Sequence, residues 1–458
     1  EVRAAVLGAW EASALPIVVS LAFDARTGRL LTGASIEAAV AMLADMGVAA
    51  IGLNCVDAPD KLLPNIERLL ACCPLPVSVS PNASLPTVVE GRTIFGATPE
   101  RFASDMRAVA ERGAWILGGC CGTTPEHIRQ MVEATRGLAP VRREVPRRCI
   151  LSGAQDAFDA DGGPFIIGER INPTGKKRLK QALREGDLDY VLAEAVAQRD
   201  AGAAVLDVNV GLPEIDEPAV LRRAVEAIQG VCSLPLQLDS ADPAALEAGL
   251  RGYVGRALIN SVSGKQAVLD AVLPLCRRYG AALVCLTLDE NGIPDTVEGR
   301  LAIARRTLAE AGAQGIGPER LFFDALTMAV STDANAARVT LETVRRLREE
   351  LHVKTVLGVS NVSFGLPQRP LLTAGFTAMA VQNGLNAAIL NPLEETVRVA
   401  FDAAVALCGH DAGFAGYIAR YGEGLARYGV TRQVPVLSPD SPLLARLATR
   451  PSATPALI

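Results

Sequence analysis

The stretch AVLDVNVG at residues 204–211 is a short apolar run that carries the polar side chains Asp207 and Asn209 near its end. Runs of the same kind recur along residues 164–392, and segments with helical periodicity separate them. Eight strand–helix units within about 250 residues is the size of a TIM (β/α)8 barrel, whereas doubly wound sheets usually stop at five or six strands. The sequence therefore predicts an α/β fold with a complete barrel. The predicted strands are PFIIGERI (164–171), AVLDVNVG (204–211), PLQLDS (235–240), ALINSV (257–262), ALVCLTLD (282–289), LFFDAL (321–326), KTVLGVSNVS (354–363) and AAILNP (387–392).

Each of these predicted strands ends on polar residues. The carboxyl ends of barrel strands converge on one mouth, which is where active sites lie in this architecture. A single aspartate after a strand can be only a helix cap, but eight polar strand ends in succession indicate a polar pocket. The residues concerned are Glu169, Asp207, Asn209, Asp239, Asn260, Asp289, Asp324, Asn361 and Asn391.

The first 140 residues contain only four such units, with strands predicted at 16–23, 49–55, 76–83 and 115–121. Four strands cannot close a barrel, so we interpret this region as the C-terminal half of a second (β/α)8 barrel. The chain opens on Glu1 within an apparent helix end, as expected of an excised fragment or an incomplete gene product.

Three cysteines stand at predicted strand ends of this first region: Cys55 after the second strand, and Cys120 and Cys121 after the fourth. In a barrel these thiols lie at one mouth, and three thiolates with an open fourth position form a catalytic type of zinc site. Glycines before the pair permit close backbone approach, and Gly122 permits the sharp turn after it. Position alone leaves two interpretations open, a zinc site or a cluster of reduced core cysteines.

Charge and composition exclude several classes of function. The net charge is −5 with both signs interspersed, which gives no basic footprint for nucleic acid. Apolar runs fall far short of the roughly 18 residues of a membrane span, and no signal peptide is evident, so a cytoplasmic protein without a membrane partner is expected. Ten cysteines in such a chain favour metal binding or catalysis for any cluster over a disulfide framework. Six others are expected to be structural: Cys72, Cys73, Cys232, Cys276, Cys285 and Cys408.

Two sets of motifs resemble known families. IGLNC (51–55) followed by GGCCGTTPEHI (118–128) resembles the zinc motif of the homocysteine S-methyltransferase family. The barrel region resembles the methyltetrahydrofolate-binding domain of cobalamin-dependent methionine synthases. The resemblance covers roughly residues 10–430 in the family's domain order, and both motif sets imply the same enzyme. The matching barrel stretches are IIGERINPTGKK, LDVNVG, LDS, INSVSG, GIP, FFDAL, VLGVSNVSFGLPQRP and GLNAAILNP.

The resemblance implies a methyltransferase of methionine synthesis. Such an enzyme moves a methyl group from 5-methyltetrahydrofolate via cobalamin to zinc-bound homocysteine, giving methionine and tetrahydrofolate. Cys55, Cys120 and Cys121 would hold the Zn²⁺. The implied segments are a partial homocysteine-binding zinc barrel over 1–140, a linker over 141–163, a pterin-binding methyltetrahydrofolate barrel over 164–430, and a tail or linker over 431–458.

The resemblance also assigns roles at the barrel mouth. Asp239, Asn260 and Asp324 would hold the edge of the pterin ring. Asn361 would lie nearest N5 and strengthen its hydrogen bond as the methyl group leaves, so Asn361 and Asp239 are the expected catalytic residues. The floor would be lined by Glu169, Asp207 and Asn209, and Arg369 would contact the folate near the mouth.

Two features depart from the family pattern. The stretch before the last strand reads GLN, with Asn386 where the family usually has aspartate, which predicts altered activity if that carboxylate orients a neighbour. Against the family pattern, we expect the homocysteine barrel to be without its first half, and residues 431–458 resemble a tail or linker and not a cobalamin-binding segment. We therefore expect poor handling of homocysteine, because unclosed sheet edges are exposed, and cobalamin supplied by another domain or a separate corrinoid protein.

Three alternatives remain beside this interpretation. The chain could be a methyltetrahydrofolate:corrinoid protein methyltransferase whose N-terminal segment is a relic. It could be a non-catalytic folate-binding or corrinoid-docking module, with the cysteines as buried filler. Dihydropteroate synthase shares the pterin barrel, but its pattern has a basic residue and a histidine on the final strand, where this chain has AILNP.

Overall fold

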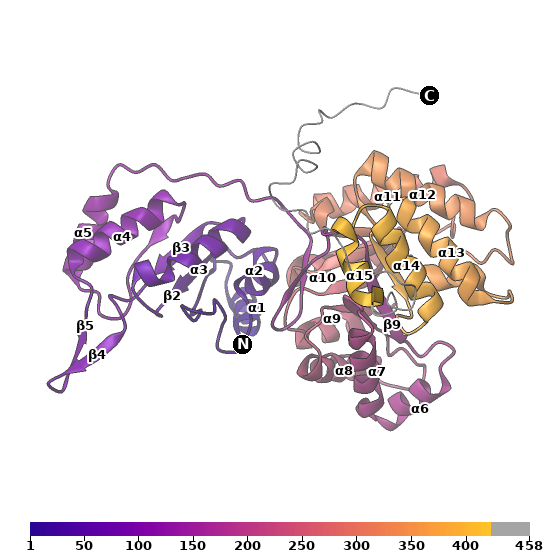
Figure 1. Ribbon diagram of the computed structural model, residues 1–458, viewed down its shortest axis with the longest axis horizontal. Coiled ribbons are helices and arrows are strands. Elements are labelled where there is room, and N and C mark those ends of the chain that lie inside the picture. Colours follow the sequence, from indigo (N-terminus) through magenta and orange to yellow (C-terminus); the bar gives the residue numbers. More distant parts are fainter. Residues whose placement is uncertain (423–458) are drawn as a thin grey trace.

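The computed structural model describes residues 1–422. The last residues of the predicted barrel segment, 423–430, and the predicted tail, 431–458, lie outside the described residues. Two α/β units follow one another along the chain, an N-terminal unit drawn in indigo and purple and a larger barrel in magenta to yellow (Figure 1). Both are built from parallel strands that alternate with helices.

The larger unit is a closed barrel of eight parallel strands, which confirms the predicted TIM barrel. Each strand pairs with its successor, and β16 pairs back with β9 to close the ring. Most strand residues are buried because helices cover the outside and side chains fill the interior. The strands are β9 (Phe165–Ile171), β10 (Val205–Val208), β11 (Leu236–Asp239), β12 (Leu258–Ser263), β13 (Ala282–Leu286), β14 (Leu321–Asp324), β15 (Lys354–Gly358) and β16 (Ala387–Leu390).

The helices of the barrel begin at residues suited to helix N-termini. Asp216, Asp242 and Thr296 each accept a hydrogen bond from a backbone N–H of the following first turn, which satisfies groups that the helix leaves free. The helices are α6 (Lys177–Glu185), α7 (Leu188–Asp200), α8 (Glu217–Val231), α9 (Pro243–Gly252), α10 (Gln266–Tyr279), α11 (Val297–Ala313), α12 (Ala336–Leu351), α13 (Arg369–Gln382), α14 (Glu395–Leu407) and α15 (Ala415–Tyr421).

Several barrel strands end before their predicted bounds, among them β10, β13, β14 and β16, and the difference at β15 bears on the site. Strand β15 ends at Gly358, and Val359–Ser363 form a turn of 3₁₀ helix instead of continuing the strand. Asn361 therefore lies on a helical turn at the barrel mouth and not within the sheet. Side chains of a 3₁₀ helix repeat their direction every three residues, whereas those of a strand alternate between two faces. The turn therefore points its side chains in directions that a continued strand would not.

The N-terminal unit is an open sheet of four parallel strands in the order β1-β2-β3-β6. Its edge residues Val18 and Ile116 are 52% and 42% exposed. The strands are β1 (Val18–Leu21), β2 (Ala50–Asn54), β3 (Val77–Ser80) and β6 (Ile116–Leu117), and the helices are α1 (Val2–Ala12), α2 (Ile36–Ala44), α3 (Pro59–Cys72), α4 (Pro99–Glu111) and α5 (Pro125–Thr135). An antiparallel hairpin that was not predicted, β4 (Pro86–Val89) and β5 (Arg92–Phe95), projects from this unit (Figure 1).

The segment expected to be a linker contains a second hairpin, β7 (Ile150–Ser152) and β8 (Ala157–Asp159). Cys149, Leu151 and Ala160 have no exposed surface and pack against residues early in the barrel strands, such as Phe165 and Val205. The hairpin thus covers the end of the barrel opposite the strand carboxyl ends. The Pro-, Arg- and Gly-rich composition of residues 140–163 predicts a linker and not a barrel cap. Only a few apolar residues are needed to close this end of the barrel, so the segment as a whole stays polar.

Truncation of Leu151 should show how much this hairpin stabilises the barrel. Leu151→Ala removes a fully buried side chain, and such changes cost about 2–5 kcal/mol in the free energy of unfolding. Val88→Ala on the exposed β4–β5 hairpin, where the side chain is 74% exposed, is the matched control and should change stability little. Urea unfolding measures both, and a Leu151→Ala midpoint equal to that of the control would contradict the packing role.

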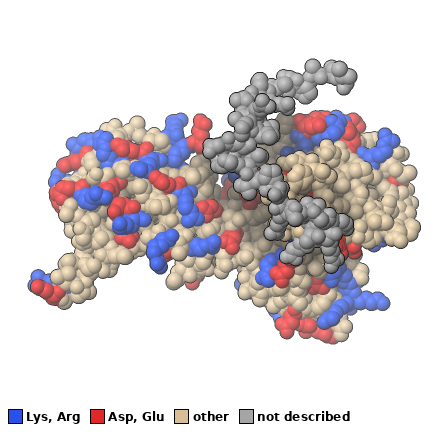
Figure 2. All heavy atoms as spheres, viewed as in Figure 1, with Lys and Arg blue, Asp and Glu red and all other residues tan. Residues whose placement is uncertain are grey.

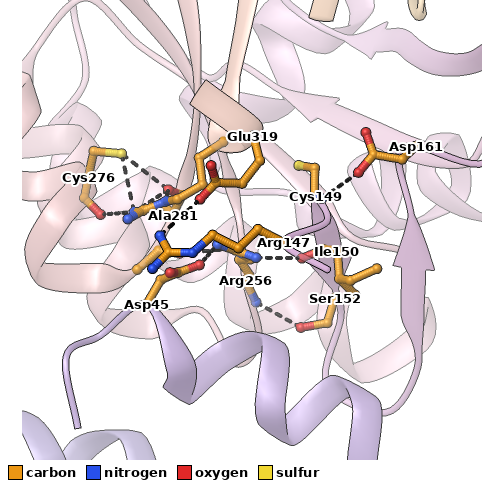
Figure 3. A network of polar contacts seen from close by, with 12 residues as sticks. Asp45, Arg147, Cys149, Ile150, Ser152, Asp161, Arg256, Cys276, Ala281 and Glu319 are labelled. Carbon is orange, nitrogen blue, oxygen red and sulfur yellow. Dashed lines mark hydrogen bonds and ion pairs between the residues drawn. The ribbon is translucent and has the colours of Figure 1, made fainter. Parts of the chain in front are cut away.

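Polar contacts join the two units beneath the barrel. Asp45, which ends α2, forms an ion pair with Arg256, a residue only 3% exposed (Figure 3). Arg256 Nε also donates to the carbonyl of Gly280 at 3.1 Å, and Ser152 Oγ donates to the carbonyl of Ala38 at 3.4 Å. Burial lowers the pKa of Arg256 to about 9. The β7–β8 hairpin therefore contacts both units and links them.

Candidate functional site

The thiols of Cys55, Cys120 and Cys121 lie together at the carboxyl ends of β2 and β6. The Sγ atoms of Cys55 and Cys121 are 3.4 Å apart, and those of Cys120 and Cys121 are 4.0 Å apart. All three Sγ atoms lie within 4.8 Å of one another, and they form the one group of potential metal ligands found among residues 1–422. The cysteines expected to be structural do not join them: Cys73 is buried and Cys72 half-buried at the end of α3.

A loop without cysteines holds the two cysteine-bearing segments in register. The carbonyls of Ser80 and Pro81 accept hydrogen bonds from the backbone N–H groups of Cys55 at 3.2 Å and Cys120 at 2.8 Å. The side-chain oxygen of Asn82 accepts from the N–H of Cys121 at 3.0 Å. Asn82 is only 5% exposed and was missed from the sequence. The SPNA stretch at residues 80–83, which begins at the last residue of β3, was the one sequence signal for Asn82.

The thiol cluster is electrostatically suited to a cation. Hydrogen bonds with Cys120 and then Cys121 raise the pKa of Cys55 to about 12, so its thiolate is disfavoured in the absence of a positive charge. In a tetrahedral zinc–thiolate site the sulfurs stand about 3.8 Å apart, given Zn–S bonds of about 2.3 Å. The observed separations bracket that spacing, so the donor set fits Zn²⁺.

Acidic and amide side chains line the mouth of the closed barrel. Asn209 Nδ2 donates to Asp239 Oδ2 at 3.0 Å, and Gln237 Nε2 donates to Asp207 Oδ1 at 2.6 Å. Asp207 is fully enclosed beneath this layer, only 2% exposed. Neighbouring strands β10, β11 and β12 thus bring the predicted residues Asp207, Asn209, Asp239 and Asn260 together.

Burial strongly perturbs these carboxyl groups. It raises the pKa of Asp239 to about 6 and that of Asp324 to about 6. Burial and the charge of Asp239 raise the pKa of Asp207 well above its ordinary value, although hydrogen bonds from Gln237 and Asn260 oppose the rise. Buried carboxyls of this kind gather at functional sites, where their charge is available to a bound ligand.

Glu169 and Arg369 lie on the other side of the mouth. Ser360 Oγ donates to Glu169 Oε1 at 3.1 Å, and Arg369 donates to the Ser360 carbonyl at 3.1 Å and the Ser363 hydroxyl at 3.2 Å. Burial raises the pKa of Glu169. These groups line a cavity of about 250 Å³ that also includes Asn391. Asn361 lies on the 3₁₀ turn that also carries Ser360 and Ser363. It is exposed to solvent and therefore accessible to a ligand.

Two further residues differ from what the sequence suggested about the mouth of the barrel. Lys176, missed from the sequence, donates from Nζ to the carbonyls of Glu169 at 2.9 Å and Arg170 at 3.0 Å. Asn386 precedes β16, at the end of the strand away from the mouth, and its Oδ1 accepts from the N–H of Thr355 at 3.0 Å. The replacement of the family's usual aspartate by Asn386 therefore affects a contact between strands at the base of the barrel and not at its mouth.

No helix within residues 1–422 combines the length and apolarity that crossing a bilayer requires.

Comparisons with known proteins divide the chain in the same way. Residues 1–135 match the family model described as homocysteine S-methyltransferase, and residues 168–391 match that described as pterin binding enzyme. Both resemblances noted from the motifs are thereby confirmed.

Curated relatives contain both regions. Methionine synthase of Mycobacterium tuberculosis is 32% identical over 412 residues, covering 85% of this chain and 34% of the relative. Methionine synthase of Mycobacterium leprae is 32% identical over 417 residues with the same coverage. The chain spans about a third of the length of these relatives. Among solved structures, dihydropteroate synthase from Xanthomonas albilineans in complex with 7,8-dihydropteroate has a TM-score of 0.44 at 20% identity, over 57% of this chain and 98% of that one.

Proposed function

We propose that this chain, which joins a homocysteine S-methyltransferase region to a pterin-binding barrel, is a methyltransferase of methionine synthesis. One site would take a methyl group from 5-methyltetrahydrofolate and the other would deliver it to homocysteine. A cobalamin carrier, in another domain or a corrinoid protein, would shuttle between them. The observation that supports this most directly is the convergence of three thiols at one mouth and several raised-pKa carboxyls at another.

At the first site, Cys55, Cys120 and Cys121 would hold Zn²⁺ by their thiolates. A zinc ion with an open fourth position lowers the pKa of a substrate thiol, so that it is a thiolate near neutral pH. The cysteines themselves contribute negative charge, which keeps the site electron-rich. The loop 80–83 fixes their spacing through backbone hydrogen bonds, so the ligand set is arranged before the substrate arrives.

At the second site, the barrel would bind the pterin through its ring edge. A pterin presents a ring N–H and an amino group side by side, and carboxylates accept such paired donors well. Asp239 and Asp324 would supply those acceptors, with Asn260 beside them. Asn361 would donate toward N5, where electron density develops as the methyl group leaves. Glu169, Asp207 and Asn209 would form the floor.

Folate binding should weaken in mild acid. Asp239 and Asp324 have pKa values of about 6 in the free protein, so both are ionised at pH 7.5 and largely protonated at pH 5.5. Because the pterin edge donates to the ionised forms, the dissociation constant should rise by roughly fourfold for each carboxylate over that range. Calorimetric titration with 5-methyltetrahydrofolate at both pH values measures the effect, and an unchanged affinity would contradict these roles.

The Asp324→Asn variant separates the effect of the buried Asp324 carboxylate on stability from its effect on folate binding. The raised pKa means that the folded protein binds more protons than the unfolded chain between about pH 4 and 6, so this carboxyl's contribution to stability declines as pH rises. The amide should therefore stabilise the fold at pH 7 while it weakens folate binding and removes one step of the pH dependence.

A second candidate, a methyltetrahydrofolate:corrinoid protein methyltransferase, is favoured by one observation: the barrel is closed, whereas the N-terminal sheet has only four strands with exposed edges. In that case methyl transfer from the folate would proceed, and zinc and homocysteine would not bind.

A further inference from the structure

Arg300 is a buried cation without an acidic partner in the described part of the chain. It is the fourth residue of α11 and is only 3% exposed. No Asp or Glu oxygen of residues 1–422 lies within 4.0 Å of its side-chain nitrogens. Surface arginines differ: Arg101 pairs with Asp105, and blue and red side chains lie side by side over the N-terminal unit in Figure 2. Because burying a charge without an ion pair is unfavourable, the guanidinium must gain from other contacts.

The guanidinium of Arg300 binds the turn that follows β14. Its Nη1 donates to the carbonyls of Ala325 at 2.6 Å and Leu326 at 3.2 Å, and its Nε donates to the carbonyl of Pro294 at 2.9 Å. Thr340 of α12, the helix beside α11 in Figure 1, donates to the same Leu326 carbonyl at 3.1 Å. Side chains of two helices therefore fix this turn.

The same turn holds Asp324, the last residue of β14. The backbone N–H of Leu326 donates to Asp324 Oδ1 at 2.7 Å. Leu326 makes this bond from a left-handed backbone conformation with a φ of 61°, which is disfavoured for a bulky residue. The carbonyl of Ala325 and the N–H of Leu326 belong to one peptide group, so Arg300 and Asp324 bind its two ends. By fixing that peptide group, Arg300 also fixes the direction from which the carboxylate is held.

The charge of Arg300 also acts on Asp324. Burial raises the pKa of Asp324 to about 6, while a backbone hydrogen bond and the positive charge of Arg300 oppose that rise. The residues paired with Asp324 on the two neighbouring strands, Leu286 and Val356, are uncharged. Burial lowers the pKa of Arg300 in turn, and the charges of Asp324 and Asp295 oppose that change. Loss of the cation should therefore make the carboxyl of Asp324 harder to ionise.

We propose that Arg300 is a positioning residue of the pterin site, which orients the carboxylate of Asp324 toward the pterin edge through the turn at residues 325–327. This inference rests on the proposed function, because it takes Asp324 to accept hydrogen bonds from the pterin. Arg300 binds the other end of the peptide group that holds Asp324, so it would touch neither the pterin nor the methyl group. Its effect is on folate affinity and on the pH dependence of that affinity.

The test measures binding of 5-methyltetrahydrofolate to the whole chain by calorimetric titration between pH 5 and 8. For Arg300→Gln we expect an affinity at pH 7.5 that is about tenfold lower than that of the wild type, because a charged hydrogen-bond donor to the turn is lost. The pH below which binding weakens should rise by about one pH unit, since a nearby cation favours the ionised carboxylate.

Arg320→Gln is the matched control. Arg320 is 2% exposed and also donates to backbone carbonyls, those of Ala281 at 3.0 Å and Cys276 at 2.8 Å, but it precedes β14 at the base of the barrel. Both variants should lose stability, whereas the control should keep the affinity and the pH dependence of the wild type. Arg300→Lys keeps the charge without the planar fork, so it should keep the pH dependence and lose about threefold in affinity.

A second comparison asks whether Arg300 acts through Asp324. In an Asp324→Asn chain, Arg300→Gln should weaken folate binding further by less than about threefold, because the two residues act on one interaction. A merely structural role would weaken binding equally in both chains, and that result would overturn the inference. An Arg300→Gln variant that behaves like Arg320→Gln would also overturn it.

Unfolding of Arg300→Gln, detected by circular dichroism, would leave the decision to Arg300→Lys. Lower affinity with an unchanged pH dependence would support the inference, and wild-type affinity would overturn it. A wild-type chain that does not bind the folate would instead overturn the proposed function.

Discussion

Replacing Cys120 by alanine is expected to remove zinc from the chain and, with it, any binding of homocysteine. Wild-type protein should carry about one zinc per chain, because three thiols with suitable spacing meet at one point. Loss of a direct ligand should reduce metal affinity by more than the roughly 10–100-fold that loss of a supporting group costs. Zinc content after dialysis, measured by elemental analysis, gives the answer.

Cys73→Ala is the matched control for this experiment. Cys73 lies in the same unit and is fully buried, but it stands outside the thiol cluster. Zinc content should therefore survive this substitution even though the fold loses some stability. A wild-type chain without zinc, or a Cys120→Ala variant that keeps it, would contradict the metal site and favour the barrel-only methyltransferase.

Replacing Asn361 by alanine should slow methyl transfer from the folate by about 10²–10³. If Asn361 donates toward N5 as the methyl group leaves, its loss removes an interaction that strengthens in the transition state, and such losses cost about 10²–10³ in rate. Folate affinity should change much less, because the pterin edge is held elsewhere. Methyl transfer from 5-methyltetrahydrofolate to added cob(I)alamin, followed by the cobalamin spectrum, measures the rate.

Asn361 is exposed, so truncation should leave the fold intact. Asn383→Ala provides the control, since Asn383 follows the last residue of α13, away from the mouth, and its side-chain amide donates to the carbonyl of Met379 at 2.8 Å. A rate for Asn361→Ala within threefold of the control would show that the residue does not act on the leaving group.

The barrel and the thiol cluster were predictable because their signals are local. A buried parallel strand is an apolar run of a few residues, and Asp207, Asp239 and Asp324 each mark the end of one such run. Once eight runs are counted, closure follows from their number. The same reasoning placed Cys55, Cys120 and Cys121 at one end of a sheet, and the structure brings their sulfurs within 4.8 Å.

Contacts between segments that lie far apart along the chain could not be predicted from the sequence. Leu151 gave no sign of filling the base of the barrel, because its burial depends on strands that lie far along the chain. The SPNA stretch marks Asn82 as polar but does not pair it with Cys121, 39 residues away, and Asn361 lies on a 3₁₀ turn and not on its predicted strand. The pKa values of the mouth carboxyls likewise depend on how completely neighbouring strands exclude water.

The order of the helices and strands and the residue types at each strand end could be predicted from the amino-acid sequence, because short runs of residue types specify both. The surroundings of each of those side chains became known only from the folded structure. Burial, hydrogen-bond partners and charge repulsion arise between residues that meet only after the chain has folded, and these set the protonation of Cys55, Asp239 and Asp324.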